Sequence, residues 1–183
     1  MRNSKLDYDL LRLKIKNGDI LLYRGSGVIS WLIKKVTGSE YSHAGIVVWW
    51  NKRLMVLEAV GKGIVCTPLS RNIGHYKGEV HWYSSCRPLP NGARGRIVQF
   101  AQMELGKEYA TWKLVLFGWK LLLGKDLDKK DEFKRRNKLV CSQYVATAYN
   151  YIGIDLKEGL SDRFTKPSDI AKSKKLIKVG AIK

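Results

Sequence analysis

SHAGIVVWWNKRLMVLEAV, residues 42–60, holds two runs of β-branched, aromatic and other apolar residues on either side of a polar pair, Asn51-Lys52. Such residues favour strands, and a short polar turn between two of these runs is typical of an antiparallel hairpin. We therefore predict strands over 42–50 and 54–60. A hairpin also fixes which side chains of its two strands share a face of the sheet.

Each run contains one ionisable side chain, His43 in the first and Glu58 in the second. An ionised carboxylate inside an apolar strand is costly unless it is paired. A register that pairs Trp49 with Lys52 places His43 directly opposite Glu58, and a register that pairs Trp50 with Arg53 makes them diagonal neighbours. Both registers put the two side chains on one face. A loop of odd length would separate them unless a bulge restored the phase.

The sequence outside the hairpin predicts further strands first and helices later. A strand is expected over 19–23, after the turn pair Asn17-Gly18, and a helix over 28–36, ending before Gly38. The remaining expected elements are strands over 63–67, 79–86 and 176–179, and helices over 93–105, 111–123, 140–152 and from Pro167, the last capped by Ser168. This order predicts an α+β fold in which an antiparallel sheet packs against helices.

Cys141 lies at the first turn of the helix expected over 140–152 and follows several basic residues. A helix N-terminus and nearby cations both favour the thiolate, which is the nucleophilic form of cysteine. The alternative is a buried structural cysteine, which is common for this residue type. Cys66 and Cys86 lie in expected strands and are interpreted as structural. An odd number of cysteines argues against a full disulfide framework.

Cys141 as nucleophile, His43 as base and Glu58 as the carboxylate that orients the imidazole would form a complete catalytic triad. The backbone amide of Cys141 is a candidate oxyanion donor, because the first amides of a helix lack intrahelical partners. Nearness in sequence makes Tyr41, Ser42 and Tyr23 candidates for substrate binding. A lone histidine on a strand is more often structural, so the triad depends on the hairpin register.

Several blocks of the chain resemble the permuted papain-like hydrolases of the YiiX/YaeF type, which are related to the NlpC-type cell-wall peptidases and to lecithin–retinol acyltransferase. The blocks are GDILLYRG (18–25), YSHAGIVV (41–48), LEAV (57–60), LVCSQYVATAY (139–149) and PSDIAKS (167–173). The resemblance implies a circularly permuted papain-like (NlpC-like) fold, with the histidine strand before the cysteine helix. It also implies His43 as base, Cys141 as nucleophile and Glu58 as the polar third member.

The function expected from these residues is hydrolysis of an amide bond, with cell-wall peptides among the candidate substrates, through an acyl-cysteine intermediate that needs no metal or organic cofactor. One alternative is a lipid-directed acyltransferase or thioesterase with the same triad. Another is a non-enzymatic basic binding module. The chain shows no recognised nucleic-acid motif, and its basic residues are spread along the sequence.

The net charge of +18, from 34 Lys and Arg against 16 Asp and Glu, is the strongest bulk property of the chain. Such a field attracts anionic membrane surfaces and polymers. We expect a single catalytic domain over 1–183, with an N-terminal extension over 1–16 and a basic insertion over 125–138 before the nucleophile helix. No signal peptide or membrane-spanning segment is evident, which favours a cytoplasmic location or a peripheral position on a membrane.

Overall fold

The computed structural model describes residues 4–60, 63–107 and 140–183. The strands are β1 (Ile20–Gly25), β2 (His43–Trp50), β3 (Arg53–Val60), β4 (Gly63–Pro68), β5 (Gly78–Ser85) and β6 (Leu176–Ala181). The helices are α1 (Ser4–Arg12), α2 (Val28–Thr37), α3 (Leu69–His75), α4 (Ala93–Met103), α7 (Val140–Asn150) and α8 (Pro167–Ala171), with a 3₁₀ turn over Asp162–Phe164.

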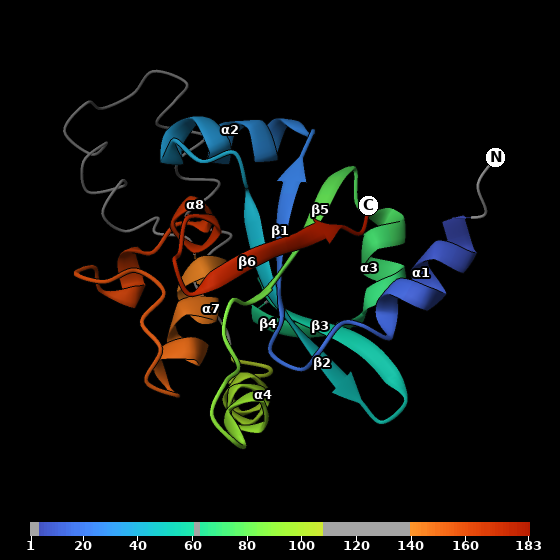
Figure 1. Cartoon of the computed structure of the whole chain (residues 1–183). Helices are drawn as coiled ribbons and strands as arrows, with labels where there is room; N and C mark the ends of the chain where they lie inside the picture. Colours follow the sequence, from blue (N-terminus) through green and yellow to red (C-terminus); the bar gives the residue numbers. More distant parts are fainter. Residues whose placement is uncertain (1–3, 61–62, 108–139) are drawn as a thin grey trace.

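The six strands form one sheet in the order β4-β3-β2-β1-β5-β6, and each neighbouring pair is antiparallel. The strand that begins with His43 therefore lies near the middle of the sheet, between β1 and β3. This arrangement confirms the predicted α+β class with an antiparallel sheet packed against helices (Figure 1).

The β2–β3 hairpin has the second of the two predicted registers. Trp50 pairs with Arg53, and the ladder runs from there to the pair Ile46–Leu57. Asn51 turns the chain with a positive φ of 53°, a conformation that asparagine adopts more readily than most residues. His43 and Glu58 lie beyond the last pair of the ladder as diagonal neighbours on one face.

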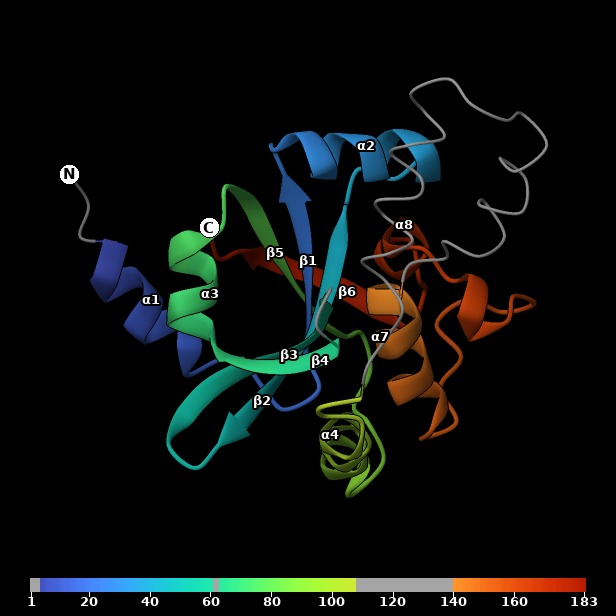
Figure 2. The same ribbon diagram turned by 180° about the vertical axis from the view of Figure 1, so that it is seen from behind.

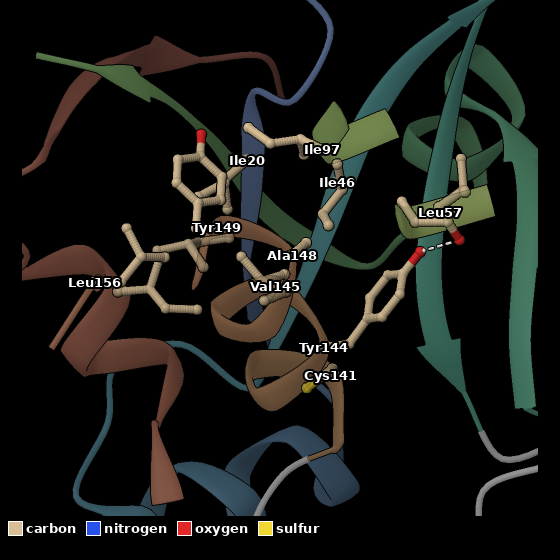
Figure 3. Packing of buried hydrophobic residues seen from close by; sticks show 14 of the residues in the cluster. Ile20, Ile46, Leu57, Ile97, Cys141, Tyr144, Val145, Ala148, Tyr149 and Leu156 are labelled. Carbon is tan, nitrogen blue, oxygen red and sulfur yellow. Dashed lines mark hydrogen bonds between the residues drawn. The ribbon is translucent and has the colours of Figure 1, made fainter. Parts of the chain in front are cut away.

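Helices cover both faces of the sheet (Figures 1 and 2). One core lies beneath α4 and α7 and contains Ile46 and Leu57, together with Val145 and Ala148 from α7. Figure 3 shows these α7 side chains directed at the strands. The other core contains the alternate strand residues, such as Val47 and Val56, and packs against α1 and α3. The two-residue period of the strands thus supplies an apolar face to each layer of helices.

A buried carboxylate ties the start of β1 to β5 and α4. Asp19 has no exposed surface, and its carboxylate lies 2.9 Å from the Arg94 guanidinium. It also accepts hydrogen bonds from the Trp82 indole at 2.8 Å, the Ser84 hydroxyl at 2.7 Å and the Lys16 amide at 3.0 Å. These donors satisfy a charge that would otherwise be costly to bury.

The predicted strands and helices within the described residues are confirmed, with ends that differ by one or two residues. The predicted Ser168 cap is wrong, because the helix begins one residue earlier and the Asp169 carboxylate accepts the Lys166 amide at 2.9 Å. The predicted helix over 111–123 and the basic segment over 125–138 lie outside the described residues. Cys86 follows the end of β5 rather than lying in it. All three cysteines are free thiols.

Candidate active site

Cys141 is the second residue of α7 and is only 6% exposed. Its sulfur accepts hydrogen bonds from the backbone amides of Ala44 and Ser142 and is also hydrogen-bonded to the His43 side chain. The Ala44 amide is free for this bond because the β2–β3 ladder has already ended at Ile46. The start of α7 therefore reaches the sheet where β2 and β3 are no longer paired, and Figure 3 shows the sulfur at that end of the helix.

His43 connects this sulfur to a carboxylate. Its Nε2 lies 2.7 Å from Oε2 of Glu58, which leaves Nδ1 for the contact with Cys141. Glu58 is 6% exposed, and its other oxygen, Oε1, accepts a hydrogen bond from the Asn72 amide at 2.6 Å. The structure thus brings Cys141, His43 and Glu58 together in the order required for a triad.

The electrostatics of the site favour the thiolate form of Cys141 and the imidazolium form of His43. Burial by itself raises the pKa of Cys141, but His43 and the two backbone amides outweigh it and lower that pKa below its usual value. Burial by itself lowers the pKa of His43, but Cys141 and Glu58 outweigh it and raise that pKa to about 10. Each partner stabilises the charged form of the other.

A cavity of about 310 Å³ lies beside His43 on the side of Glu58. It is lined by residues of β1, α2, β2, β3 and α3 and their connections: Tyr23, Ser30, Ile33, Ser42, His43, Glu58, Val60, Asn72 and Tyr76. The cavity reaches the candidate base directly, so a group held in it would lie next to the imidazole.

The three candidate substrate-binding residues have different positions. Ser42 and Tyr23 line the cavity, although the Ser42 hydroxyl donates to the Tyr23 carbonyl at 3.3 Å. The Tyr41 hydroxyl lies instead 2.7 Å from Nδ1 of His81 and 3.0 Å from the Tyr83 hydroxyl. The structure therefore brings two of the three to the cavity and places the third in a separate polar cluster.

Comparison with known proteins identifies the family of this chain. The model of the family described as permuted papain-like amidase enzyme, YaeF/YiiX, C92 family matches residues 14–175. The chain belongs to this family. The predicted resemblance and the predicted class, a papain-like cysteine peptidase or amidase, are confirmed at the family level. A search of curated proteins finds no match.

Among solved structures, this C92-family chain is similar to the crystal structure of the metalloprotein yiiX from Escherichia coli O157:H7. The two share 24% identity, with a TM-score of 0.65 over 90% of this chain and 96% of that one. The similarity supports the predicted permuted papain-like fold. Within the residues described here, no group of three or more His, Cys, Asp and Glu side chains is placed to hold a metal ion. No helix in the described part is long and apolar enough to cross a membrane.

Asn72 is a site residue that the sequence analysis missed. It lies on α3, a seven-residue helix that was not predicted. The available signal was the spacing of Leu69 and Ile73, two buried apolar residues four positions apart that place one side of this helix on the sheet. The Ser-Arg-Asn sequence between them is typical of a loop, so no helix was predicted here.

The lowered pKa of Cys141 gives a prediction for thiol chemistry. At about pH 6, iodoacetamide should modify Cys141 before Cys66, because burial raises the pKa of the Cys66 thiol and the thiolate is the reactive form. Mass spectrometry of the cysteine peptides against time measures both rates. His43→Ala should remove the advantage of Cys141, and a wild-type protein in which Cys66 reacts first would contradict the assigned ion pair.

Proposed function

We propose that this chain hydrolyses an amide bond through an acyl-cysteine intermediate. The Cys141 sulfur attacks the amide carbon and forms an S–C bond, and the C–N bond breaks as His43 gives its proton to the leaving nitrogen. Water then attacks the thioester carbon while His43 takes one of its protons, and the C–S bond breaks to restore the thiolate. The supporting observation is the continuous hydrogen-bonded series from Cys141 through His43 to Glu58.

The charge that develops on the carbonyl oxygen requires a donor. The backbone amide of Cys141 is the proposed donor, because it belongs to the first turn of α7, where amides have no intrahelical acceptor. The positive end of the helix dipole acts on the oxyanion in the same direction. Glu58 holds the imidazole in one orientation and stabilises its charged form.

The substrate class that we favour is a peptide or related amide, including cell-wall peptides. The family is one of amidases, and most of the side chains that line the cavity beside His43 are polar, which suits a peptide group better than a long acyl chain. The net charge of +18 would hold the protein close to an anionic polymer that carries such amides.

One observation favours a second candidate, a lipid-directed acyltransferase or thioesterase with the same triad. On α2, Val28 and Trp31 are 64% and 54% exposed, and Lys35 lies over the Trp31 ring at 4.9 Å. These residues share one face of the helix, and Ser30 and Ile33 of the same helix line the cavity. Exposed tryptophan next to cations is typical of a surface that contacts lipid headgroups.

Turnover of matched substrates separates the two candidates. We expect release of amine from short peptide amides, and a lower rate of fatty-acid release from phosphatidylglycerol vesicles at equal acyl concentration. His43→Ala should abolish both. Faster release of fatty acid than of amine would assign the site to lipid, and absence of both reactions in the wild-type protein would contradict the proposed chemistry.

Glu58→Gln should narrow the pH range of activity from its alkaline side. The imidazolium is the proton donor to the leaving group, and it persists in the wild-type protein up to the His43 pKa of about 10. Because Glu58 raises the pKa of His43, its loss should move the alkaline limb of the kcat/KM profile to lower pH. The same loss should lower kcat/KM at neutral pH on the order of 100-fold. An alkaline limb that does not move would show that Glu58 does not act on His43.

A further inference from the structure

We propose that Asn72, supported by the Tyr23 hydroxyl, is a positioning residue that keeps the Glu58 carboxylate aligned to accept the hydrogen bond of His43. This inference rests on the proposed function, because it assigns a role relative to the same triad. Asn72 makes no described contact with the sulfur, so it would act through Glu58 and not on the substrate.

Every hydrogen bond in this series is donated toward the Glu58 carboxylate. The Tyr23 hydroxyl donates to Oδ1 of Asn72 at 2.9 Å, and Nδ2 of Asn72 donates to Oε1 of Glu58 at 2.6 Å. His43 donates to the other carboxylate oxygen at 2.7 Å. The reverse orientation of the Asn72 amide would place its carbonyl oxygen against the carboxylate, so the network itself fixes the orientation.

Because Glu58 and Tyr23 are buried, the hydrogen bonds of Asn72 have a strong effect on the orientation of the Glu58 carboxylate. Glu58 is 6% exposed and Tyr23 is fully buried, so loss of Asn72 would take from each of these largely desolvated groups a partner within the protein. Asn72 also fixes one carboxylate oxygen while His43 binds the other, which restricts rotation of the carboxylate about its last bond. Without Asn72, the carboxylate would have an unpaired buried oxygen and could turn away from the imidazole.

The helix that carries Asn72 is held by packing and by a hydrogen bond from the C-terminal residue. Leu69 and Ile73 anchor α3 in the core, and the Lys183 ammonium donates to the Ile73 carbonyl at 2.6 Å. The Tyr23 ring packs against the His43 ring with centroids 5.2 Å apart, and against the Tyr76 ring at 5.0 Å. The network therefore closes on itself, since Tyr23 contacts His43 by its ring and reaches Glu58 through Asn72.

The described titratable groups that face His43 come from three elements: Cys141 from α7, Glu58 from β3 and Tyr23 from β1. Burial, together with the charge of Glu58, raises the pKa of Tyr23 well above its usual value, so this phenol remains a hydrogen-bond donor. The contribution of Asn72 to the pH profile can therefore be measured without interference from Tyr23 ionisation.

The experiment is the pH dependence of Cys141 alkylation by iodoacetamide, read by peptide mass spectrometry from about pH 5 to 9. The variants are Asn72→Ala, Glu58→Gln, the double variant, Tyr23→Phe and His43→Ala, with alkylation of the exposed Cys86 in each protein as internal control. Tyr23→Phe removes one hydroxyl and keeps the ring on His43, so it tests the same series without opening a cavity. Thermal unfolding of each variant reports any general loss of stability.

We expect Asn72→Ala to raise the midpoint of Cys141 alkylation by about one pH unit, which is a tenfold slower reaction below the midpoint. Tyr23→Phe should shift it less in the same direction. The double variant should match Glu58→Gln alone, because residues that act through one another are not additive.

An Asn72→Ala profile that superimposes on the wild type would overturn the inference. Shifts that add in the double variant would do the same, since they would give Asn72 a role independent of Glu58. A wild-type midpoint equal to that of His43→Ala would instead show that the thiolate–imidazolium pair is absent, and the proposed function would fall together with the positioning role.

Discussion

Cys141→Ala is expected to lower amide hydrolysis by a factor on the order of 10⁴ or more, because the proposed mechanism has no other atom to form the covalent intermediate. The substitution removes one buried sulfur at the start of α7 and leaves the apolar face of that helix intact. Thermal unfolding should therefore show a folded protein. Initial rates of amine release from a peptide amide, at matched protein concentration, measure the loss.

Cys86→Ala is the matched control for this substitution. Cys86 is an exposed free thiol on the loop after β5, where it donates to the Lys174 carbonyl, and it should be dispensable for turnover. The Cys141→Ala variant should also keep the salt-dependent binding to anionic vesicles that a charge of +18 produces. Substantial turnover by Cys141→Ala would remove the nucleophile from the mechanism.

Asp19→Ala is expected to cost about 3 to 5 kcal/mol of the free energy of unfolding, because it removes a fully buried carboxylate that accepts hydrogen bonds from three donors besides Arg94. The Arg94 guanidinium would lose its carboxylate, and the Trp82 indole would lose its acceptor. Urea unfolding followed by tryptophan fluorescence gives the difference directly.

Asp9→Ala provides the comparison for Asp19. Asp9 is 59% exposed and lies 3.9 Å from Arg12, a surface pair that should change the stability by no more than about 0.5 kcal/mol. Equal effects of the two substitutions would contradict the structural role of the buried pair.

The hairpin was predictable because its pattern is local. Alternation of apolar residues and a polar turn allowed two registers that bring the ionisable side chains to one face, and the observed pair Trp50–Arg53 belongs to one of them. The meeting of His43 with Glu58 followed from the period of the strands together with a turn of even length. The face shared by Cys141 and Tyr144 likewise followed from helical spacing, and both residues lie in the core beneath α7.

Other features depend on contacts between distant segments and left little trace in the sequence. The Ala44 amide can bind the Cys141 sulfur only because the ladder ends at Ile46, and no residue pattern marks that end. Asn72 reaches Glu58 from a helix too short to show a clear period. Tyr41 was predicted to bind substrate because it is close to His43 in the sequence, but its hydroxyl contacts His81 on β5.

The geometry also explains how the reversed order of histidine and cysteine gives a papain-like site. The triad needs a strand end that carries the base, a neighbouring strand that carries the carboxylate and a helix N-terminus that carries the thiol. These requirements concern position in space. The two strands can therefore come before the helix in the sequence and still form the same site. The α7 helix meets that condition by packing across β2 and β3 in a single core.

The most direct test of the account is to trap the covalent intermediate. The wild-type protein is mixed with the p-nitrophenyl ester of a short N-acyl peptide, quenched in acid during the first turnover, and digested for mass spectrometry. We predict one equivalent of rapid nitrophenol release and the acyl mass on the peptide that contains Cys141, with neither in Cys141→Ala. Acyl groups found only on another residue, or an equal burst from Cys141→Ala, would contradict the assignment of this cysteine as the nucleophile.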